Sequence, residues 1–118
     1  MNEKFPKIIV IEDNEDIISM IKMMLEMKHY EVFLRMNTDN ILGFIKEIQP
    51  HLIIMDMLLS GGDGREICKS LKQNPELSHI PVLMISAHPN AKEQCALAGA
   101  NFFLSKPFDI QEFYQTIE

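Results

Sequence analysis

Cysteine and concentrated positive charge are both scarce in this sequence, and each scarcity argues against a class of function. Of 118 residues only two are cysteines, and Cys68 and Cys95 lack the CxxC spacing of zinc and redox sites. We expect both to be reduced core residues of a cytosolic protein. A zinc site that combines them with His79 and His88 is the alternative, although no ligand spacing supports it. The net charge is −6 and there is no Lys/Arg cluster, so a nucleic-acid-binding surface is not expected.

Long apolar runs are also missing. No stretch approaches the length of a membrane-spanning helix. The apolar run IIVI at 8–11 is too short for the core of a signal peptide, and it leads directly into acidic residues. With 47% hydrophobic and 24% charged residues, the composition is typical of a folded globular protein. We therefore expect one cytoplasmic domain over residues 1–118, with neither nucleic acid nor membrane as a direct partner.

Short apolar runs alternate with amphipathic segments along the chain. The runs predict strands at 7–11, 31–36, 52–55, 81–86 and 102–104. The amphipathic segments predict one helix after Asn14 and four more at 38–49, 65–74, 91–99 and 109–118. This alternation is typical of an α/β fold whose parallel sheet carries helices on both faces. The strands are continuously apolar, as expected where both faces of a sheet are covered.

The first predicted helix has a clear start and a methionine-rich body. Asn14 is the predicted N-cap. One face of the helix is predicted to carry Ile17, Ile21, Met24 and Lys28. Four methionines on this helix are interpreted as core filling rather than as metal ligands: Met20, Met23, Met24 and Met27.

Polar residues stand where the predicted strands end. They are Glu12 and Asp13 after the first strand, Asp56 after the third, Ser86 at the end of the fourth and Lys106 after the fifth. Ligands of doubly wound sheets bind beyond the carboxyl ends of the strands. If the first and third strands are neighbours, the three carboxylates converge.

Converging carboxylates require protons or a cation. At a separation of about 5 Å and an effective dielectric near 20, two unit charges repel by roughly 3 kcal/mol. Three such repulsions total on the order of 10 kcal/mol, which is comparable to the stability of a small domain. Oxygen ligands without nearby His or Cys favour a hard ion, above all Mg2+. We therefore predict Mg2+ at Glu12, Asp13 and Asp56, with Lys106 balancing the remaining charge.

The same residues suit phosphoryl transfer. A carboxylate such as Asp56 can attack as a nucleophile and form an aspartyl phosphate. A metal ion and Lys106 can stabilise charge on the phosphoryl oxygens, and the hydroxyl of Ser86 can donate to one of them.

Four segments, taken together and in order, resemble the receiver domain of two-component response regulators. They are IEDN at 11–14, IIMDMLLSGGDGREIC at 53–68, PVLMISA at 81–87 and GANFFLSKPF at 99–108. The resemblance covers essentially the whole chain. It implies a doubly wound five-stranded sheet in the flavodoxin-like order 2-1-3-4-5. It also implies a signalling phosphoprotein of a phosphorelay, with no enzyme activity apart from self-catalysed phosphotransfer and autodephosphorylation.

The resemblance implies roles for individual residues. Asp56 would accept a phosphoryl group from the phosphohistidine of a histidine kinase or a histidine phosphotransfer protein. Lys106 would bridge Asp56 and the phosphoryl group, and the Lys106–Pro107 peptide is expected to be cis. The ligands of Mg2+ would be Glu12, Asp13, Asp56 and the backbone carbonyl of Leu58.

A switch is also implied. Ser86 would move toward the phosphoryl group, and the ring of Phe103 would turn into the space that Ser86 leaves. That movement would repack the surface formed by helix 91–99, strand 102–104 and helix 109–118. Partners, or a second copy in a homodimer, would bind there.

Three positions depart from the family pattern or tune it. Ser60 lies where proline is usual, which predicts a looser loop after Asp56. Phe103 lies where many members have tyrosine, so a hydroxyl contact is lost while the ring switch is retained. An apolar Leu58 can shield the site from water, which predicts slow self-dephosphorylation.

Other functions remain as alternatives. A Mg2+-dependent phosphatase of the haloacid-dehalogenase type needs a second Asp two residues after the nucleophile, where this chain has Leu58. A flavin-binding module needs a first loop rich in Ser, Thr and Gly, where this chain has EDNED at 12–16. A degenerate receiver would bind partners without phosphorylation. A free-standing receiver and one excised from a longer regulator would look alike at this stage.

Overall fold

A five-stranded parallel sheet forms the centre of the computed structural model, which describes residues 6–59 and 62–117. Its strands are β1 (Lys7–Ile11), β2 (Glu31–Arg35), β3 (Leu52–Asp56), β6 (Val82–Ser86) and β7 (Phe102–Ser105). They lie in the order β2-β1-β3-β6-β7, and all neighbours are parallel. This is the predicted order 2-1-3-4-5, because the short strands β4 and β5 lie outside the sheet.

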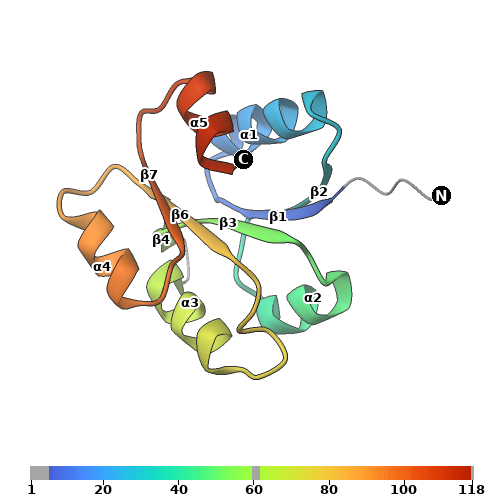
Figure 1. The fold of residues 1–118 in the computed structure, drawn as a ribbon, viewed down its shortest axis with the longest axis vertical. Helices are drawn as coiled ribbons and strands as arrows, with labels where there is room; N and C mark the ends of the chain where they lie inside the picture. Colours follow the sequence, from blue (N-terminus) through green and yellow to red (C-terminus); the bar gives the residue numbers. More distant parts are fainter. Residues whose placement is uncertain (1–5, 60–61, 118) are drawn as a thin grey trace.

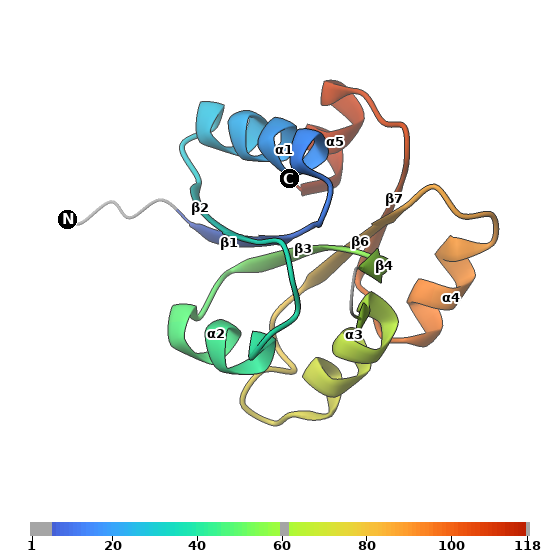
Figure 2. The same cartoon turned by 180° about the vertical axis from the view of Figure 1, so that it is seen from behind.

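Helices cover both faces of the sheet, which confirms the doubly wound architecture. They are α1 (Glu15–Met27), α2 (Ile41–Ile48), α3 (Gly64–Gln73), α4 (Ala91–Leu97) and α5 (Ile110–Ile117). Figures 1 and 2 show α1 and α5 on one face and α2, α3 and α4 on the other. Among the described residues, no helix is both long and apolar enough to cross a membrane.

Two core layers result from the alternation of side chains along each strand. In β1, Ile8 and Val10 pack in the layer with α1 and α5, and Ile9 and Ile11 pack in the layer with α2, α3 and α4. All four are buried. Burial of one such side chain contributes about 1.5–3 kcal/mol, so the sheet is anchored from both faces. The continuous apolar runs of the sequence follow from this double cover.

Local signals place most helix ends correctly. The side chain of Asn14 accepts a hydrogen bond from the backbone N–H of Ile17 at 3.0 Å, which confirms the predicted N-cap of α1. Gly99 follows α4 with φ 101°, the left-handed conformation that favours glycine and ends the helix. The helix predicted from residue 38 begins only at Ile41, because Asn40 has a left-handed φ of 49° and cannot continue a helix.

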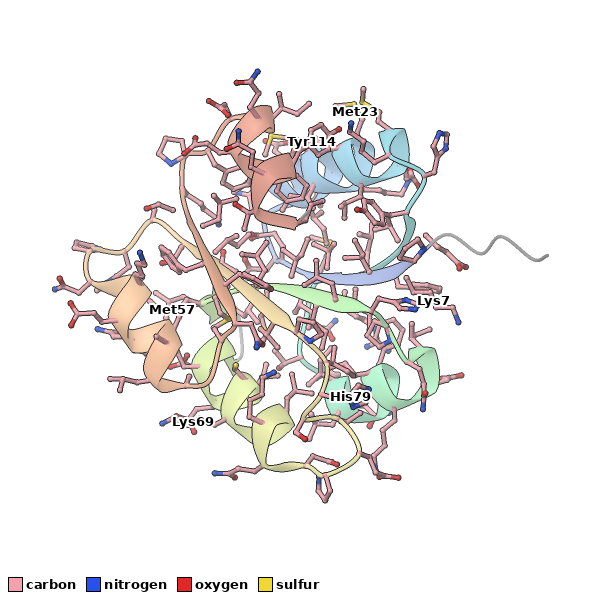
Figure 3. All side chains as sticks on the ribbon, in the orientation of Figure 1. Lys7, Met23, Met57, Lys69, His79 and Tyr114 are labelled. Atoms are coloured by element: carbon pink, nitrogen blue, oxygen red, sulfur yellow. The ribbon has the colours of Figure 1, made fainter. Side chains whose placement is uncertain are left out.

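The prediction that the four methionines of α1 fill the core is wrong for three of them. Met24 is buried, whereas Met20, Met23 and Met27 are 38%, 57% and 62% exposed. The buried face of α1 consists of Ile18, Ile21, Met24 and Leu25. A residue turns by about 100° relative to its predecessor in an α-helix, so the other three methionines lie on the opposite side. Figure 3 shows Met23 on the outer side of α1.

The loop between β3 and α3 contains a hairpin that was not predicted. Strands β4 (Leu58–Leu59) and β5 (Gly62–Asp63) pair antiparallel. Directly after them, Gly64 begins α3 so close to β3 that an added Cβ would lie 2.3 Å from the carbonyl oxygen of Asp56. Glycine is therefore required at this position. Ser60 lies outside the described residues, and the looser loop stays a prediction.

Candidate functional site

The carboxyl ends of β1 and β3 bring the three predicted carboxylates together. Ile11 at the end of β1 pairs with Met55 of β3, so Glu12 and Asp56 follow at the same edge of the sheet. Glu12, Asp13 and Asp56 each offer one carboxylate oxygen, and these three atoms lie within 4.8 Å of one another. Glu12 and Asp56 are buried. The convergence expected from the strand order is therefore present.

Lys106 lies opposite the carboxylates at the end of β7. Its Nζ donates to Oδ2 of Asp56 at 2.6 Å and to Oε1 of Glu12 at 3.1 Å. The side chain of Lys106 is only 17% exposed, so this ion pair is largely removed from water. The Lys106–Pro107 peptide is cis, as the resemblance implied.

The pKa values of these groups reflect their crowding. Burial raises the pKa of the Glu12 carboxyl, and hydrogen bonds from the Asn14 backbone and from Lys106 offset only part of that rise. The negative charge of Asp56 raises the same pKa further. Burial lowers the pKa of Lys106, but its hydrogen bonds to Asp56 and Glu12 outweigh burial and leave the pKa above its ordinary value. One ammonium thus faces three carboxylates. When all three are ionised, the site carries an excess of negative charge that a bound cation would neutralise.

Both oxygens of Asp56 are held in place. Oδ2 accepts from Lys106, and Oδ1 accepts a hydrogen bond from the backbone N–H of Leu58 at 3.1 Å. The side chain of Leu58 is half exposed beside the site. The roles assigned to the carbonyl and the side chain of Leu58 stay predictions.

Ser86 and Phe103 lie on the neighbouring strands β6 and β7, where Ser86 pairs with Ser105 and Phe103 pairs with Met84. Ser86 is buried at the end of β6, where its Oγ accepts a hydrogen bond from the backbone N–H of His88 at 3.0 Å. The backbone N–H of Lys106 donates to the carbonyl oxygen of Ser86 at 2.9 Å. Phe103 is half-buried in the layer with α4 and lines a groove of about 600 Å³ beside that helix. The switch expected of this pair stays a prediction.

An apolar groove beside the site was missed at the sequence level. It has a volume of about 370 Å³ and is lined by Ile17, Met20, Ala87, Lys106, Pro107 and Phe108. The interpretation of Met20 as a core residue does not predict this groove, because Met20 is 38% exposed in the structure. The 3.6-residue period, centred on the residues that the structure buries, would have placed Met20 at the surface.

The zinc alternative finds no support in the geometry. Cys68 and Cys95 are fully buried in the same core layer, and burial raises the pKa of both thiols. Within residues 6–59 and 62–117, the one group of three or more His, Cys, Asp or Glu side chains close enough to share an ion is that of Glu12, Asp13 and Asp56. His79 and His88 belong to no such group.

Comparison with known protein sequences agrees with this geometry. Residues 8–118 match the family model of the response regulator receiver domain. The polar-differentiation response regulator DivK of Brucella anthropi is 32% identical over 113 residues, which are 94% of this chain and 92% of DivK. The chain spans about half the length of other curated relatives that it matches.

Solved structures give the same result. A response regulator from Chloroflexus aurantiacus is 32% identical and superposes with a TM-score of 0.90, over 95% of this chain and 93% of the other. The receiver domain of a sensor histidine kinase from Pseudomonas aeruginosa, which has a magnesium ion coordinated in its active-site cleft, is 25% identical with a TM-score of 0.85. That match covers 94% of this chain and 93% of the other. The chain therefore belongs to the family of response regulator receiver domains.

Proposed function

We propose that this receiver domain accepts a phosphoryl group on Asp56 from a phosphohistidine of a histidine kinase or a histidine phosphotransfer protein, in the cytoplasm. The single observation that supports this most strongly is the contact of Lys106 with Asp56 at 2.6 Å. Glu12 and Asp13 each place a carboxylate oxygen within 4.8 Å of an oxygen of Asp56. A buried nucleophile flanked by a fixed cation and by further acids suits phosphoryl transfer better than it suits any structural role.

The residues present fit Mg2+. Its ligands would be the carboxylates of Glu12, Asp13 and Asp56 and the backbone carbonyl of Leu58. These are hard oxygen donors, and their excess negative charge over Lys106 favours a divalent ion. Bound there, Mg2+ would neutralise charge on the phosphoryl oxygens during transfer.

The chain's own residues supply the remaining chemistry. An oxygen of Asp56 attacks phosphorus, so a P–O bond forms while the P–N bond to the donor imidazole breaks. Lys106 and the N–H of Leu58 hold the carboxylate in one orientation for this attack. The Oγ of Ser86 already accepts from His88, and its hydroxyl hydrogen can turn to donate to a phosphoryl oxygen.

The output is proposed to pass through α4, β7 and α5. Ser86 would move toward the new phosphoryl group, and the half-buried ring of Phe103 would follow it inward. The groove of about 600 Å³ beside Phe103 would then change shape. A downstream partner, or a second copy of this chain, would bind that face in one of its two states.

The apolar groove beside Lys106 suits the phosphohistidine donor. Any protein that brings a phosphohistidine to Asp56 must cover the rim of the site, and Ile17, Met20 and Phe108 form an apolar part of that rim. Methionine side chains adapt to different apolar partners. The donor protein would complement this groove with an apolar helical surface next to its phosphohistidine.

Phosphorylation in vitro tests the proposed function. After incubation with acetyl phosphate and Mg2+, the intact wild-type chain should gain the mass of one phosphoryl group, and Asp56→Asn should gain none. Asp39→Asn removes an exposed carboxylate from the loop after β2 and should behave as wild type. An unmodified wild-type mass would indicate a receiver that acts without phosphorylation. Continuous release of alcohol from a phosphate ester would indicate a phosphatase instead.

A further inference from the structure

The start of α3 is fixed to the strand that carries Asp56. The backbone N–H of Gly64 donates to the carbonyl oxygen of Met57 at 2.7 Å. Asp63 pairs with Leu58 in the β4–β5 hairpin, and the N–H of Leu58 donates to Oδ1 of Asp56. A displacement of the segment after Asp56 therefore displaces the first residues of α3.

Asp63 at this position holds the side chain of Arg65. Nε of Arg65 donates to Oδ1 at 3.0 Å, and Nη2 donates to Oδ2 at 2.7 Å. Oδ1 also accepts the backbone N–H of Arg65 at 2.9 Å, so that Asp63 caps α3. The hydrogen bond from Arg65 lowers the pKa of the Asp63 carboxyl. Two-point contact of this kind fixes the plane of the guanidinium.

The remaining end of the guanidinium reaches α4. Nη1 of Arg65 donates to Oε1 of Gln94. Figures 1 and 2 both show α3 and α4 side by side on the same face of the sheet. Arg65 and Gln94 lie in a groove of about 350 Å³ between these helices, which Lys69 and Leu97 also line.

Helix α4 has few constraints of its own. It has seven residues, and its N-cap Asn90 makes no capping hydrogen bond with its side chain. Its buried residues are Ala91 and Cys95, two small side chains. A helix this short is marginal without tertiary contacts, so one hydrogen bond from a neighbouring element weighs heavily on its position.

We propose that the Asp63–Arg65–Gln94 contacts form a second link between the phosphorylation site and α4, separate from Ser86 and Phe103. Arg65 is a positioning residue in this link, because its side chain bonds to Asp63 and Gln94. The proposal rests on the proposed function, since the signal that it transmits is the phosphorylation of Asp56. With these contacts intact, a movement of the segment after Asp56 displaces the start of α3, and Arg65 transmits that displacement to Gln94 on α4.

Hydrogen exchange of α4 tests the link in the unphosphorylated protein. Arg65→Ala and Gln94→Ala should each raise the exchange rates of the amides at 91–98 by about threefold to tenfold, because each loses the same hydrogen bond. The double variant should exchange no faster than either single variant. Lys69→Ala is the matched control, since Lys69 is a cation on α3 that lines the same groove and pairs with Glu66 on its own helix. Rates in both single variants equal to those of Lys69→Ala would overturn the link.

The response to a phosphoryl mimic tests transmission. Beryllofluoride with Mg2+ should change the exchange of α4 in the wild type, and Arg65→Ala should show at most half of that change. Acetyl phosphate should still phosphorylate Arg65→Ala at Asp56, as measured by intact mass. A full α4 response in Arg65→Ala would overturn transmission alone. Failure of the wild type to take up a phosphoryl group would overturn the proposed function and transmission together.

Discussion

Oppositely charged side chains pair at both ends of the sheet, but the two pairs differ in how far they are exposed to water. At the amino end, a cavity of about 330 Å³ is lined by residues that include His51, Glu76 and His79. Glu76 pairs there with Lys46 at 3.0 Å, and the two side chains are 72% and 50% exposed. At the carboxyl end, Lys106 and Asp56 form a shorter pair that is largely buried.

This difference supports the proposal that the carboxyl end is the functional end. An exposed pair retains its hydration and contributes little to stability, so Lys46 and Glu76 need no special explanation. In the buried cluster, the contacts of Lys106 outweigh its own burial, but the burial of Glu12 is only partly offset and the pKa of its carboxyl stays raised. Such a cluster indicates a ligand, whereas the concavity at the amino end does not. The following predictions, from the largest effect to the smallest, test that contrast.

Replacing the two lysines should separate the two ends most clearly. Lys106→Met should slow phosphorylation of Asp56 by acetyl phosphate at least about 100-fold, because one fixed positive charge is lost at the transferring group. It should also lower the free energy of unfolding by about 2 kcal/mol without Mg2+, since buried carboxylates lose their partner. Lys46→Met should change that free energy by less than about 0.5 kcal/mol and leave phosphorylation as it is. Urea unfolding and intact-mass kinetics measure both quantities, and equal effects of the two variants would contradict the contrast.

Neutralising Glu12 at the carboxyl end should weaken metal binding but raise stability. Neutralising Glu76 at the amino end should change neither. Glu12→Gln should weaken Mg2+ binding about tenfold, yet raise the free energy of unfolding in EDTA by about 1 kcal/mol, because a buried charge is removed. Burial raises the pKa of Glu12 above its ordinary 4.5, so its ionisation costs stability only as the pH rises above that value. The gain in Glu12→Gln should therefore be larger at pH 7 than at pH 4. Glu76→Gln should show neither effect, and a stability gain that did not depend on pH would contradict this explanation.

The lifetime of the phosphoryl group should depend on Leu58 by a smaller factor. If the half-exposed Leu58 shields the aspartyl phosphate, wild type should lose its phosphoryl group slowly, with a half-life of minutes or longer, and Leu58→Asn should lose it severalfold faster. Time courses of intact mass after removal of acetyl phosphate give both rates. A wild-type half-life of seconds would show that Leu58 does not shield the site.

The smallest effect is expected at the amino end. Replacement of both His51 and His79 by Ala should leave Mg2+ affinity and phosphoryl uptake within twofold of wild type, because neither side chain belongs to the carboxylate cluster. Titration calorimetry and intact-mass kinetics are sufficient measurements. A loss of either Mg2+ affinity or phosphoryl uptake would indicate that the cavity at the amino end takes part in function.

The strands, and the edge of the sheet at which polar residues follow them, were predictable from local signals, whereas the strand order came from the resemblance to receiver domains. Buried parallel strands read as continuous apolar runs, and parallel strands place their carboxyl ends at one edge. Glu12 and Asp56 therefore had to lie close together once β1 and β3 were neighbours. Lys106 could be assigned for the same reason, because it directly follows β7 at that edge.

The features that could not be predicted from the sequence depend on how the helices and strands pack against one another. Helix α1 has isoleucine, leucine or methionine at most of its positions, so its pattern leaves several possible buried faces, and packing on the sheet selects one. The two-residue strands β4 and β5 are too short for any alternation to be visible. The contact of Arg65 with Gln94 depends on how α4 packs beside α3, and neither helix encodes it alone.

Paramagnetic broadening by Mn2+, used in place of Mg2+, tests most directly whether the carboxyl-end carboxylates hold a divalent cation. In NMR spectra of the wild-type protein, substoichiometric Mn2+ should broaden the amide signals around Glu12, Asp56 and Lys106. Signals around His51 and His79 at the amino end should remain sharp, and excess Mg2+ should restore those that were broadened. Broadening confined to the amino end, or absent from the residues around Asp56, would contradict the assignment.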